Sequence, residues 1–487
     1  MRVVVVGGGI GGLALGAGLR RRGYEVMVFD RDTDVAATGG YHITLDGRAL
    51  SALRELVAPE VMRRLLASSS ALRLRDRDAI WDRHGRLLGL GPDLSGVSSV
   101  DVDRITLRTL LAEEVRDDLY LGRTVSGVRQ DDDGVPRVLF TDAPPVPADL
   151  VVGADGAHSL VARHLAGRRT NSPAGIVGFS GRTLRADLGP AERRRLGLRS
   201  GLAIGPRGAA LYIGFLDPVG NAALDAPELR MSVTTGPTYI WGAMFPESPG
   251  TDSLRALRGG ELRAALSSRF RAFGWAGHTL EVIARADPDG VAAYRFNAAS
   301  TRAAELAPWA AGRITALGDA VHATPPTAGM GAGAAIRDAA ALLRHLGDAG
   351  DAGDAGDAGD AGDAGDAGDG TTTVEAVARF EAEMRRRGPH ARHEDGPPDP
   401  DHRHHTRRRR HRRDHPGPGR RRPAVASRSA RHRRPHGART ARRSLSIGED
   451  GPDRRPPDRR QVRRRPARVP RRRGVGPEQL RAASTRD

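Results

Sequence analysis

The chain has 487 residues, contains no cysteine and carries a formal net charge of +18. Without cysteine it can form neither a disulfide nor a redox-active cysteine pair, which excludes disulfide-stabilised folds and the two-nucleotide disulfide reductases. Its apolar runs fall short of the ~20 residues of a membrane span and a strand-like run begins within two residues of Met1, so we expect a cytoplasmic protein without a signal peptide.

The first segment predicts a strand, a glycine-rich turn, a helix and a second strand. Val3–Val6 is a β-branched run suited to a buried parallel strand. The string Gly7-Gly8-Gly9-Ile10-Gly11-Gly12 follows it, and residues 13–22 indicate a helix that ends at Gly23. Here Gly7 allows a tight turn, Gly9 lets backbone amides approach a pyrophosphate, and Gly12 allows close packing of helix on strand.

A carboxylate closes this first unit. The second strand, Tyr24–Phe29, ends at Asp30, about 20 residues beyond the glycines, where a carboxylate can accept hydrogen bonds from both hydroxyls of an adenosine ribose. A 2′-phosphate would be repelled there. Arg31 either stacks near the adenine or is solvated. The unit predicts nucleotide binding, against the alternative of a glycine-rich turn without a ligand.

The stretch up to residue 174 alternates between helices and short strands. Residues 38–56 predict a loop and then an amphipathic helix, and a further helix begins at Arg104. The weakly alternating residues 71–100 predict strands that leave the nucleotide-binding domain. The runs 120–130 and 136–140 predict a hairpin, and residues 149–153 a buried strand that ends in a second string, Gly153-Ala154-Asp155-Gly156.

Residues 175–295 have a different character. Strand-like runs occur at 209–216, 230–235 and 239–245, and one helix is predicted over Ser253–Phe273. We expect a mostly antiparallel sheet that is inserted into the nucleotide-binding domain. Such a sheet can present an apolar face to a cofactor and hold a substrate there.

The chain then returns to a buried strand, residues 314–317, which leads into a third string. This string is Leu317-Gly318-Asp319-Ala320-Val321-His322. The glycine-rich loop 329–333 precedes a predicted helix over Ala334–His345, so free backbone amides at the start of that helix can point toward a ligand. The helix dipole would stabilise negative charge there.

The order of these three strings resembles that of the flavoprotein aromatic hydroxylases related to p-hydroxybenzoate hydroxylase. The resemblance covers roughly residues 1–388 and implies bound FAD. It implies an α/β fold in which a Rossmann-like FAD-binding domain carries an inserted, mostly antiparallel substrate domain. The FAD-binding domain would comprise residues 1–70, 100–174 and 296–346, and the substrate domain residues 71–99 and 175–295.

The resemblance also implies roles for individual residues. Asp155 would organise the loop near the pyrophosphate and touch the transient path of NAD(P)H, although a capping aspartate before a helix is the alternative. Asp319 would bind a ribityl hydroxyl, and Arg104 would approach the cofactor. The implied cofactor contacts comprise Gly7, Gly9, Gly12, Asp30, Arg31, Arg104, Asp155, Gly318, Asp319, Pro325, Gly331, Ala332 and Gly333.

Two positions depart from the family pattern. Gly333 stands where the family commonly has asparagine, so only a backbone contact survives there. The arginine that often precedes the Gly39-Gly40 region is absent, because residues 36–38 are Ala-Ala-Thr. No metal site is expected. The general base stays open among Tyr41, His42, Tyr212, Tyr239 and His278.

The activity implied by the resemblance is hydroxylation of an aromatic or polyketide-like small molecule. NAD(P)H would reduce the flavin, dioxygen would add at ring carbon C4a, and the hydroperoxide would deliver one oxygen atom to the substrate. The protein would position the reactants and exclude water. Geranylgeranyl-reductase-like enzymes keep a similar nucleotide-binding domain and are the alternative enzyme class. The substrate, the choice between NADH and NADPH, and the oligomeric state stay open.

The end of the chain has a composition of its own. Residues 347–367 are consecutive Gly-Asp-Ala triplets within a predicted linker, 347–370, and a helix is predicted over 371–388. Residues 389–487 contain 31 arginines, 11 acidic residues and no Phe, Trp or Tyr, so we expect a disordered tail. Its arginine runs could bind nucleic acid, but the lack of stacking aromatics argues against this. We hypothesise that the coding frame is lost near residues 387–395.

Overall fold

The computed structural model describes residues 1–37, 42–325, 329, 331–356 and 367–387. All of them belong to one compact unit. The predicted tail over 389–487, the candidate base Tyr41 and the middle of the Gly-Asp-Ala repeat lie outside the described residues. No described helix is long and apolar enough to span a membrane.

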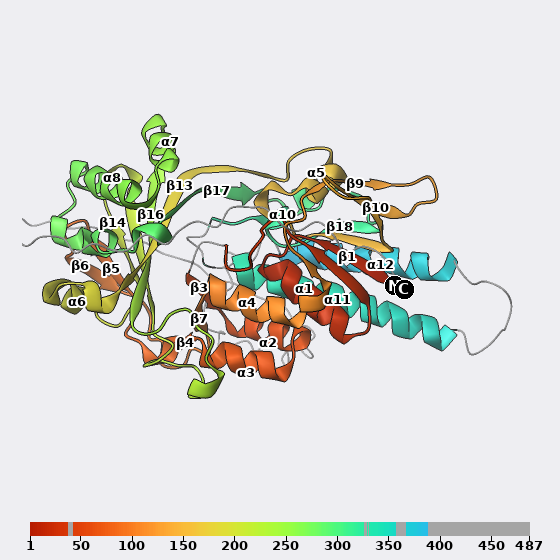
Figure 1. Ribbon diagram of the computed structural model, residues 1–487, viewed down its shortest axis with the longest axis horizontal. Helices are drawn as coiled ribbons and strands as arrows, with labels where there is room; N and C mark the ends of the chain where they lie inside the picture. Colours follow the sequence, from red (N-terminus) through yellow and green to blue (C-terminus); the bar gives the residue numbers. More distant parts are fainter. Residues whose placement is uncertain (38–41, 326–328, 330, 357–366, 388–487) are drawn as a thin grey trace, which may run out of the picture. The chain divides into compact units, whose positions relative to one another are not determined.

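The first of the two large sheets of the fold has five parallel strands (Figure 1). Val3 and Val5 on its central strand face one hydrophobic cluster, while Val4 and Val6 face another. Because alternate side chains of a strand point to opposite faces, this run of valines buries both faces of the sheet, as predicted. In spatial order the strands are β18 (Ile314–Ala316), β12 (Leu150–Gly153), β1 (Arg2–Val6), β2 (Glu25–Phe29) and β8 (Leu119–Tyr120).

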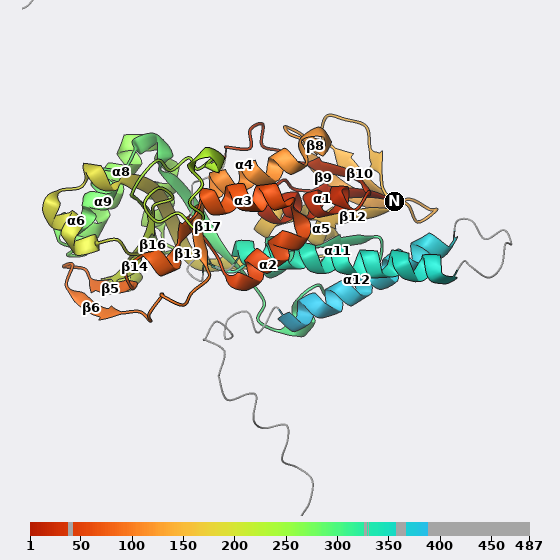
Figure 2. The ribbon, with the colours of Figure 1, turned by 90° about the horizontal axis from the view of Figure 1, so that it is seen from below.

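Helices pack against one face of this sheet, and a small sheet and a short helix cover the other. Contacts join α1 to α2, α4 and α11 (Gly331–Gly356), and α11 to α12 (Ala367–Arg387); α11 and α12 lie side by side in Figure 2. On the other face α5 contacts β9, β12 and β18. The bounds are α1 (Ile10–Arg21), α2 (Gly47–Leu56), α3 (Pro59–Ala67), α4 (Arg104–Glu114), α5 (Leu160–Ala166), β9 (Val125–Gln130), β10 (Pro136–Phe140) and β11 (Val146–Pro147).

A second, seven-stranded sheet takes five of its strands from residues 171–299, and β5 and β6 are the other two. Every neighbouring pair is antiparallel except β14 and β5, which agrees with the predicted mostly antiparallel sheet. Its aromatic core includes Phe245, Phe270 and Trp275. The strands in order are β17 (Ala292–Ala299), β13 (Asn171–Leu184), β16 (Thr238–Pro246), β15 (Ala210–Leu216), β14 (Gly201–Ile204), β5 (Ala79–Asp82) and β6 (Leu87–Leu90).

A three-stranded sheet and several short helices complete the fold. The strand order is β3 (His42–Leu45), β7 (Val100–Asp103) and β4 (Ser70–Ala71). The contact between β15 and β7 joins the seven-stranded sheet to this small sheet. The remaining short helices are α6 (Pro190–Leu196), α7 (Pro249–Ala256), α8 (Gly259–Ala272), α9 (Glu281–Ala284) and α10 (Asp319–His322).

Two predicted elements were wrong. The single helix over 253–273 is two helices, α7 and α8, because Leu257 and Arg258 are extended and Gly259 has a φ of +53°. Residues 230–235 form no strand. Three of their backbone amides donate to side chains instead: Met231 N–H to Ser68 Oγ at 2.8 Å, Val233 N–H to Thr106 Oγ1 at 3.1 Å, and Thr234 N–H to Ser232 Oγ at 3.1 Å.

The last two helices extend into the repeat on both sides. The helix predicted over 334–345 is α11 (Gly331–Gly356), and the helix predicted over 371–388 is α12 (Ala367–Arg387). No proline lies in the repeat residues that α11 and α12 include, so a helix can form there despite the cost of the glycines. Val377, Phe380 and Met384 are buried and fix α12 against the main core.

Candidate cofactor site

Two positions of the first glycine string require glycine, because backbone atoms lie too close to them to leave room for a Cβ atom. Gly7 has a φ of +109°, and a Cβ atom at this position would lie 2.4 Å from the carbonyl oxygen of Ala154. A Cβ atom at Gly12 would lie 2.0 Å from the carbonyl oxygen of Gly7. Among the described residues, a Cβ atom at Gly9 would meet nothing within 4 Å. The turn is therefore tight on its protein side and open at Gly9, the N-cap of α1.

Asp30 organises this turn. Its Oδ2 accepts a hydrogen bond from Gly8 N–H at 2.5 Å, and its Oδ1 accepts one from Asp32 N–H at 2.7 Å. These contacts place the carboxylate at the end of β2 beside the glycine string, as the spacing predicted. The neighbouring Arg31 is exposed.

Arg108 on α4 belongs to the same turn, and the sequence analysis missed it. Its side chain is buried, its Nε donates to the carbonyl oxygen of Gly8 at 2.9 Å, and its Nη1 donates to Asp32 at 2.8 Å. Its Nη2 lies 3.4 Å from Asp30. The sequence does hold a signal for Arg108. It lies between the inward-facing Leu107 and Leu111, and a buried arginine requires a buried partner.

The carboxylate of Asp155 accepts hydrogen bonds from residues that follow it in the chain. Its Oδ1 accepts a hydrogen bond from Ser159 Oγ, and its Oδ2 accepts one from Leu160 N–H at 2.7 Å. Ser159 Oγ in turn accepts from Ala162 N–H at 2.9 Å and caps α5. Burial raises the pKa of Asp155 above its ordinary value, although these hydrogen bonds lower it. These contacts are those of a capping aspartate, which was the alternative for this residue, and its role near the pyrophosphate stays a prediction.

The third string packs directly on the first. Cβ atoms at Gly11 and at Gly318 would each lie 2.9 Å from Cβ of Ala335, so the first turns of α1, α10 and α11 meet around this small side chain. Gly318 has a φ of +61°, which a residue with a side chain rarely adopts. A Cβ atom at Gly331 would lie 3.4 Å from Asp319 Oδ1. Strings that are about 310 residues apart in sequence therefore form one backbone cradle.

Asp319 presents its carboxylate within this cradle. Its side chain is exposed, yet the surrounding protein raises its pKa through burial, while the nearby charges of His322 and Arg104 lower it. Its backbone is held in place, because Asn171 Nδ2 donates to its carbonyl oxygen at 2.9 Å. The charge of Arg104 thus acts on Asp319, and the roles of both toward a cofactor stay predictions.

Asp338 on α11 supports the cradle from behind. It is buried, and its Oδ2 accepts a hydrogen bond from Gly318 N–H at 3.0 Å and another from His322 Nε2. Its Oδ1 lies 3.1 Å from Nη2 of Arg387 on α12. Burial alone would raise the pKa of Asp338, but His322 and Arg387 hold it below its ordinary value. Likewise Asp338 raises the pKa of His322 against the effect of burial.

Two candidate bases from the sequence meet where the seven-stranded sheet contacts the small sheet. The hydroxyl of Tyr212 on β15 lies 2.9 Å from Nδ1 of His42 on β3. His42 Nε2 lies 2.9 Å from Asp101 Oδ2, and Arg75 holds the same carboxylate at 3.6 Å. Burial would raise the pKa of Asp101, but His42 and Arg75 lower it overall. Tyr239 is instead buried and donates to the carbonyl oxygen of Gly197.

The remaining predicted contacts lie around the start of α11. Gly333 is buried, and a Cβ atom there would lie 3.3 Å from Cβ of Ala49. Ala332 is half-buried against the main core, and Pro325 is half-buried just after α10. Within the ranges that the structure covers, no group of three or more His, Cys, Asp or Glu side chains could hold a metal ion.

The family profile described as "FAD binding domain" matches residues 1–189 and 278–358. The chain belongs to this FAD-binding family. Its matched segments carry all three strings, and the segment between them holds three strands of the seven-stranded sheet, β14, β15 and β16. The glycine cradle, open at Gly9 and lined by Asp319, fits a bound FAD. The predicted FAD-binding fold and the resemblance to flavoprotein monooxygenases are therefore confirmed.

Relatives of known name agree with this family. Zeaxanthin epoxidase of Spinacia oleracea is 28% identical over 359 residues, which cover 69% of this chain and 46% of the relative. The chain thus spans about half the length of the plant epoxidases that it matches. The 3-amino-4-hydroxybenzoate 2-monooxygenase PtmB3 of Streptomyces platensis is 29% identical over 366 residues, which cover 72% of this chain and 80% of the relative.

Solved structures show the same fold. CtdE in complex with FAD and a substrate superposes with a TM-score of 0.62 at 18% identity, covering 80% of this chain and 87% of that one. Klebsiella pneumoniae HpxO, complexed with FAD and uric acid, gives 0.57 at 23% identity, covering 81% and 90%.

Proposed function

We propose that this protein is an FAD-dependent monooxygenase that hydroxylates an aromatic or polyketide-like small molecule with NAD(P)H and dioxygen. The observation that carries the proposal is the backbone cradle formed by the three strings beside the seven-stranded sheet. Relatives matched over four-fifths of their length, PtmB3 and the aurachin C monooxygenase/isomerase of Stigmatella aurantiaca, have names that support a monooxygenase reaction.

Each part of the cradle has a proposed role toward FAD. The amides at Gly9 and the N-terminus of α1 would bind the pyrophosphate, because a helix N-terminus carries unpaired N–H groups and a partial positive charge. Asp30 would also accept the ribose hydroxyls of the adenosine. Asp319, with Arg104 nearby, would bind the ribityl chain. The amides of residues 331–333 at the start of α11 would face the pyrimidine edge of the ring.

When bound, the flavin would supply the oxygen-transfer chemistry, with dioxygen adding at ring carbon C4a as the resemblance implies. The protein would position the substrate and exclude water from the ring. The contact of Tyr212 with His42 would hold the seven-stranded sheet against the FAD-binding part on the substrate side. An aromatic substrate is supported by PtmB3, whose name gives 3-amino-4-hydroxybenzoate, because that match spans 80% of the relative, whereas the match to the zeaxanthin epoxidase of Spinacia oleracea spans 46%.

The test uses the full chain purified with FAD. We expect NAD(P)H oxidation to accelerate with at least one member of a panel of phenols and aminobenzoates, with one oxygen atom incorporated from labelled dioxygen. Mixing the reduced protein with dioxygen should give a transient C4a adduct in the absorption spectrum. Reoxidation without any adduct, together with reduction of a prenyl double bond, would favour the reductase alternative.

A further inference from the structure

The face of the seven-stranded sheet opposite its aromatic core carries Tyr212. On β15 the side chains of Leu211, Ile213 and Phe215 belong to the aromatic core. Because alternate side chains of a strand point to opposite faces, Tyr212 lies on the other face. Gly242 lies directly opposite Tyr212 on β16. A Cβ atom at Gly242 would meet only Cβ of Tyr212 within 4 Å, at 3.9 Å, among the described residues beyond its chain neighbours. The sheet is therefore open beside Tyr212.

The ring of His42 packs against this face. A Cβ atom at Gly214, two residues beyond Tyr212, would lie 2.8 Å from Cγ of His42, so only a glycine lets the ring approach the strand this closely. The Tyr212 hydroxyl lies 2.9 Å from His42 Nδ1. The side chain of His42 is only 4% exposed. The imidazole is therefore buried next to the Tyr212 hydroxyl.

A buried carboxylate fixes the proton positions of this pair. Oδ2 of Asp101 on β7 lies 2.9 Å from His42 Nε2 and 3.6 Å from Arg75. Its Oδ1 accepts a hydrogen bond from Thr44 Oγ1 at 2.7 Å. Burial would raise the pKa of Asp101, but His42 and Arg75 lower it overall, so the carboxylate is ionised at neutral pH. A carboxylate beside one ring nitrogen of a histidine favours the proton on that nitrogen, which leaves Nδ1 as the acceptor for the Tyr212 hydroxyl.

The charged groups that act on His42 come from two elements. Asp101 lies on β7, whereas Arg75 and Asp78 lie in the segment that leads to β5. Arg75 is buried and binds the half-exposed Asp78 at 2.8 Å. Two carboxylates and one guanidinium leave the surroundings of His42 with one excess negative charge. A proton on His42 offsets this charge, so the network favours proton uptake.

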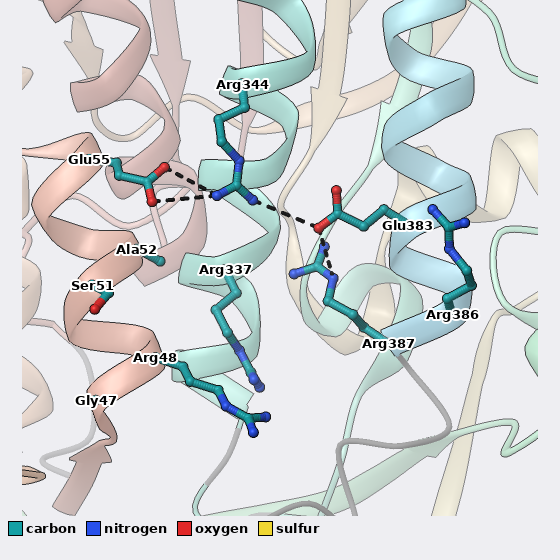
Figure 3. Close-up of a pocket in the computed structure, with 10 residues that line it drawn as sticks. All are labelled: Gly47, Arg48, Ser51, Ala52, Glu55, Arg337, Arg344, Glu383, Arg386 and Arg387. Carbon is teal, nitrogen blue, oxygen red and sulfur yellow. Dashed lines mark hydrogen bonds and ion pairs between the residues drawn. The ribbon is translucent and has the colours of Figure 1, made fainter. Parts of the chain in front are cut away.

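His42 also lies close to the helix that would face the flavin ring. The strand β3, which begins at His42, contacts α11 and leads into α2. Ala49 on α2 packs on Gly333 at the start of α11. Figure 3 shows the far part of the same helix pair, where Arg344 on α11 lies 3.3 Å from Glu55 on α2. The strand that carries His42 is therefore fixed beside the first turn of α11, whose amides would face the ring.

The other candidate bases that the structure describes lie elsewhere. Tyr239 belongs to the aromatic core on the opposite face of the sheet. His278 is exposed, and its Nε2 lies beside Gly85 in the turn between β5 and β6. Tyr212 and His42 are therefore the candidates that combine a place on the open face with a buried acceptor for a proton.

We propose that the substrate is a phenol whose hydroxyl binds the Tyr212 hydroxyl, and that His42 receives the phenol's proton through Tyr212. The inference rests on the proposed function, because it places the substrate ring on the open sheet face beside the flavin. In this step the substrate O–H bond breaks as its proton moves to the Tyr212 oxygen, and the Tyr212 proton moves to Nδ1 of His42. The products are a phenolate, a neutral tyrosine and an imidazolium paired with Asp101.

Each group has a separate part in this step. Tyr212 is the catalytic residue, because it touches the substrate, whereas His42 and Asp101 act through it. Burial raises the pKa of Tyr212, and Asp101 raises it further although Arg75 lowers it, so the tyrosine stays neutral and passes the proton on. A phenolate ring is richer in electrons than a phenol ring, which suits it to receive an electrophilic oxygen atom from the flavin.

The first test measures phenol binding without turnover. The full chain loaded with FAD is dialysed to equilibrium against 4-nitrophenol or 4-nitroanisole, which has the same ring but no proton to give. We expect 4-nitrophenol to bind at least ~10-fold more tightly, the effect of a charge-assisted hydrogen bond. The difference spectrum should show the bound ligand as phenolate at a pH about one unit lower than in water.

Two variants decide what causes this preference. In Tyr212→Phe the preference for 4-nitrophenol should vanish, and its ionisation should follow that in water. Tyr239→Phe is the matched control, since it removes a hydroxyl from the same sheet on the opposite face, and it should behave like the parent. Equal binding of the two ligands by the parent, or a preference that persists in Tyr212→Phe, would overturn the inference.

The second test separates this inference from the proposed function. With a phenol that the parent hydroxylates, Tyr212→Phe and His42→Gln should lower kcat by about 100-fold near neutral pH, with FAD content and Tm unchanged. The loss should shrink as the pH approaches the ordinary ~10 of a phenol, because the substrate then ionises unaided. A loss of equal size at every pH would overturn the relay.

Two further outcomes have separate meanings. If the parent hydroxylates no phenol of the panel, the proposed function is overturned, while the dialysis still decides whether Tyr212 binds a phenol. If His42→Gln does not fold, Tyr212→Phe alone decides, because it removes one hydroxyl and keeps the ring.

Discussion

The two large sheets of this chain differ in what holds them together. At the parallel sheet, backbone of one string touches backbone of another, so a Cβ atom at Gly12 would lie 2.0 Å from the Gly7 carbonyl oxygen. In the seven-stranded sheet the core is a set of interlocking aromatic side chains, in which the ring of Phe270 lies 4.7 Å from that of Phe245 and 4.7 Å from that of Trp275.

This difference separates two kinds of constraint. Backbone atoms cannot move aside as side chains can, so one added methyl group can prevent the cradle from forming. Side-chain cores tolerate hydrophobic substitution at a modest cost, provided that volume is roughly conserved. We therefore expect substitutions in the cradle to affect FAD binding and substitutions in the aromatic core to affect stability alone.

The largest effect is expected from Gly12→Ala. Its methyl group would overlap the Gly7 carbonyl, and we expect a loss of roughly 5 kcal/mol or more, at the extreme of single substitutions. The protein should be recovered unfolded or without flavin. Circular dichroism melts and flavin absorbance of the purified chain measure both.

Gly9→Ala is the matched control, because the same methyl group meets no described atom within 4 Å. It should fold with a normal Tm but bind FAD more weakly, since the methyl group would lie where the pyrophosphate approaches. Equal FAD affinity for Gly9→Ala and the parent would contradict the proposal that the pyrophosphate binds at this turn.

A smaller effect is expected from Asp338→Asn, behind the cradle. It leaves His322 and Arg387 without their buried anion, which should cost about 3–5 kcal/mol of unfolding free energy. Glu55→Gln removes a half-exposed ion pair with Arg344 and should cost under ~1 kcal/mol. Denaturant titrations compare the two, and similar losses would contradict the supporting role of Asp338.

The stability loss of Asp338→Asn should depend on pH. The raised pKa of His322 gives stability that is full below its ordinary value of 6.5 and is lost as pH rises through the folded pKa. The lowered pKa of Asp338 gives stability that is present above its ordinary 3.8 and is lost as pH falls through the folded pKa. The deficit of Asp338→Asn should therefore be largest between about pH 4 and 6.5. A deficit independent of pH would contradict the charged pair.

Asp319→Asn should act on the cofactor alone. Its carboxylate is exposed in the cradle, so stability should stay within about 0.5 kcal/mol of the parent. If the carboxylate binds a ribityl hydroxyl, FAD affinity should fall by about 10- to 100-fold, the range for a charged hydrogen bond. Fluorescence titration with FAD measures this, with the exposed Asp117→Asn as control.

The smallest effect on FAD is expected from Phe270→Leu in the seven-stranded sheet. Losing one buried ring from its stack should lower stability by roughly 1–2 kcal/mol. The FAD dissociation constant should change less than about twofold, since Phe270 lies in a hydrophobic cluster separate from those that flank the parallel sheet. A loss of FAD affinity as large as that of Asp319→Asn would show that the two regions are not independent.

The sequence predicts best those parts of the fold whose structure depends on residues that are neighbours in the chain. Val3–Val6, the glycine string and Asp30 follow one another directly, and the structure has them as a strand, a turn and a carboxylate beside it. Arg108 and Asp338 were missed because their importance depends on partners about 100 and 20 residues away. The break at Gly259 and the side-chain partners of residues 230–235 likewise depend on tertiary contacts.

FAD titration of the purified full chain tests the central claim most directly. We predict that the protein is yellow or takes up one FAD per chain, and that Gly9→Ala weakens this binding without lowering the Tm. A colourless protein that folds with a cooperative melt yet does not bind added FAD would contradict the assignment of the three-string cradle as a flavin site.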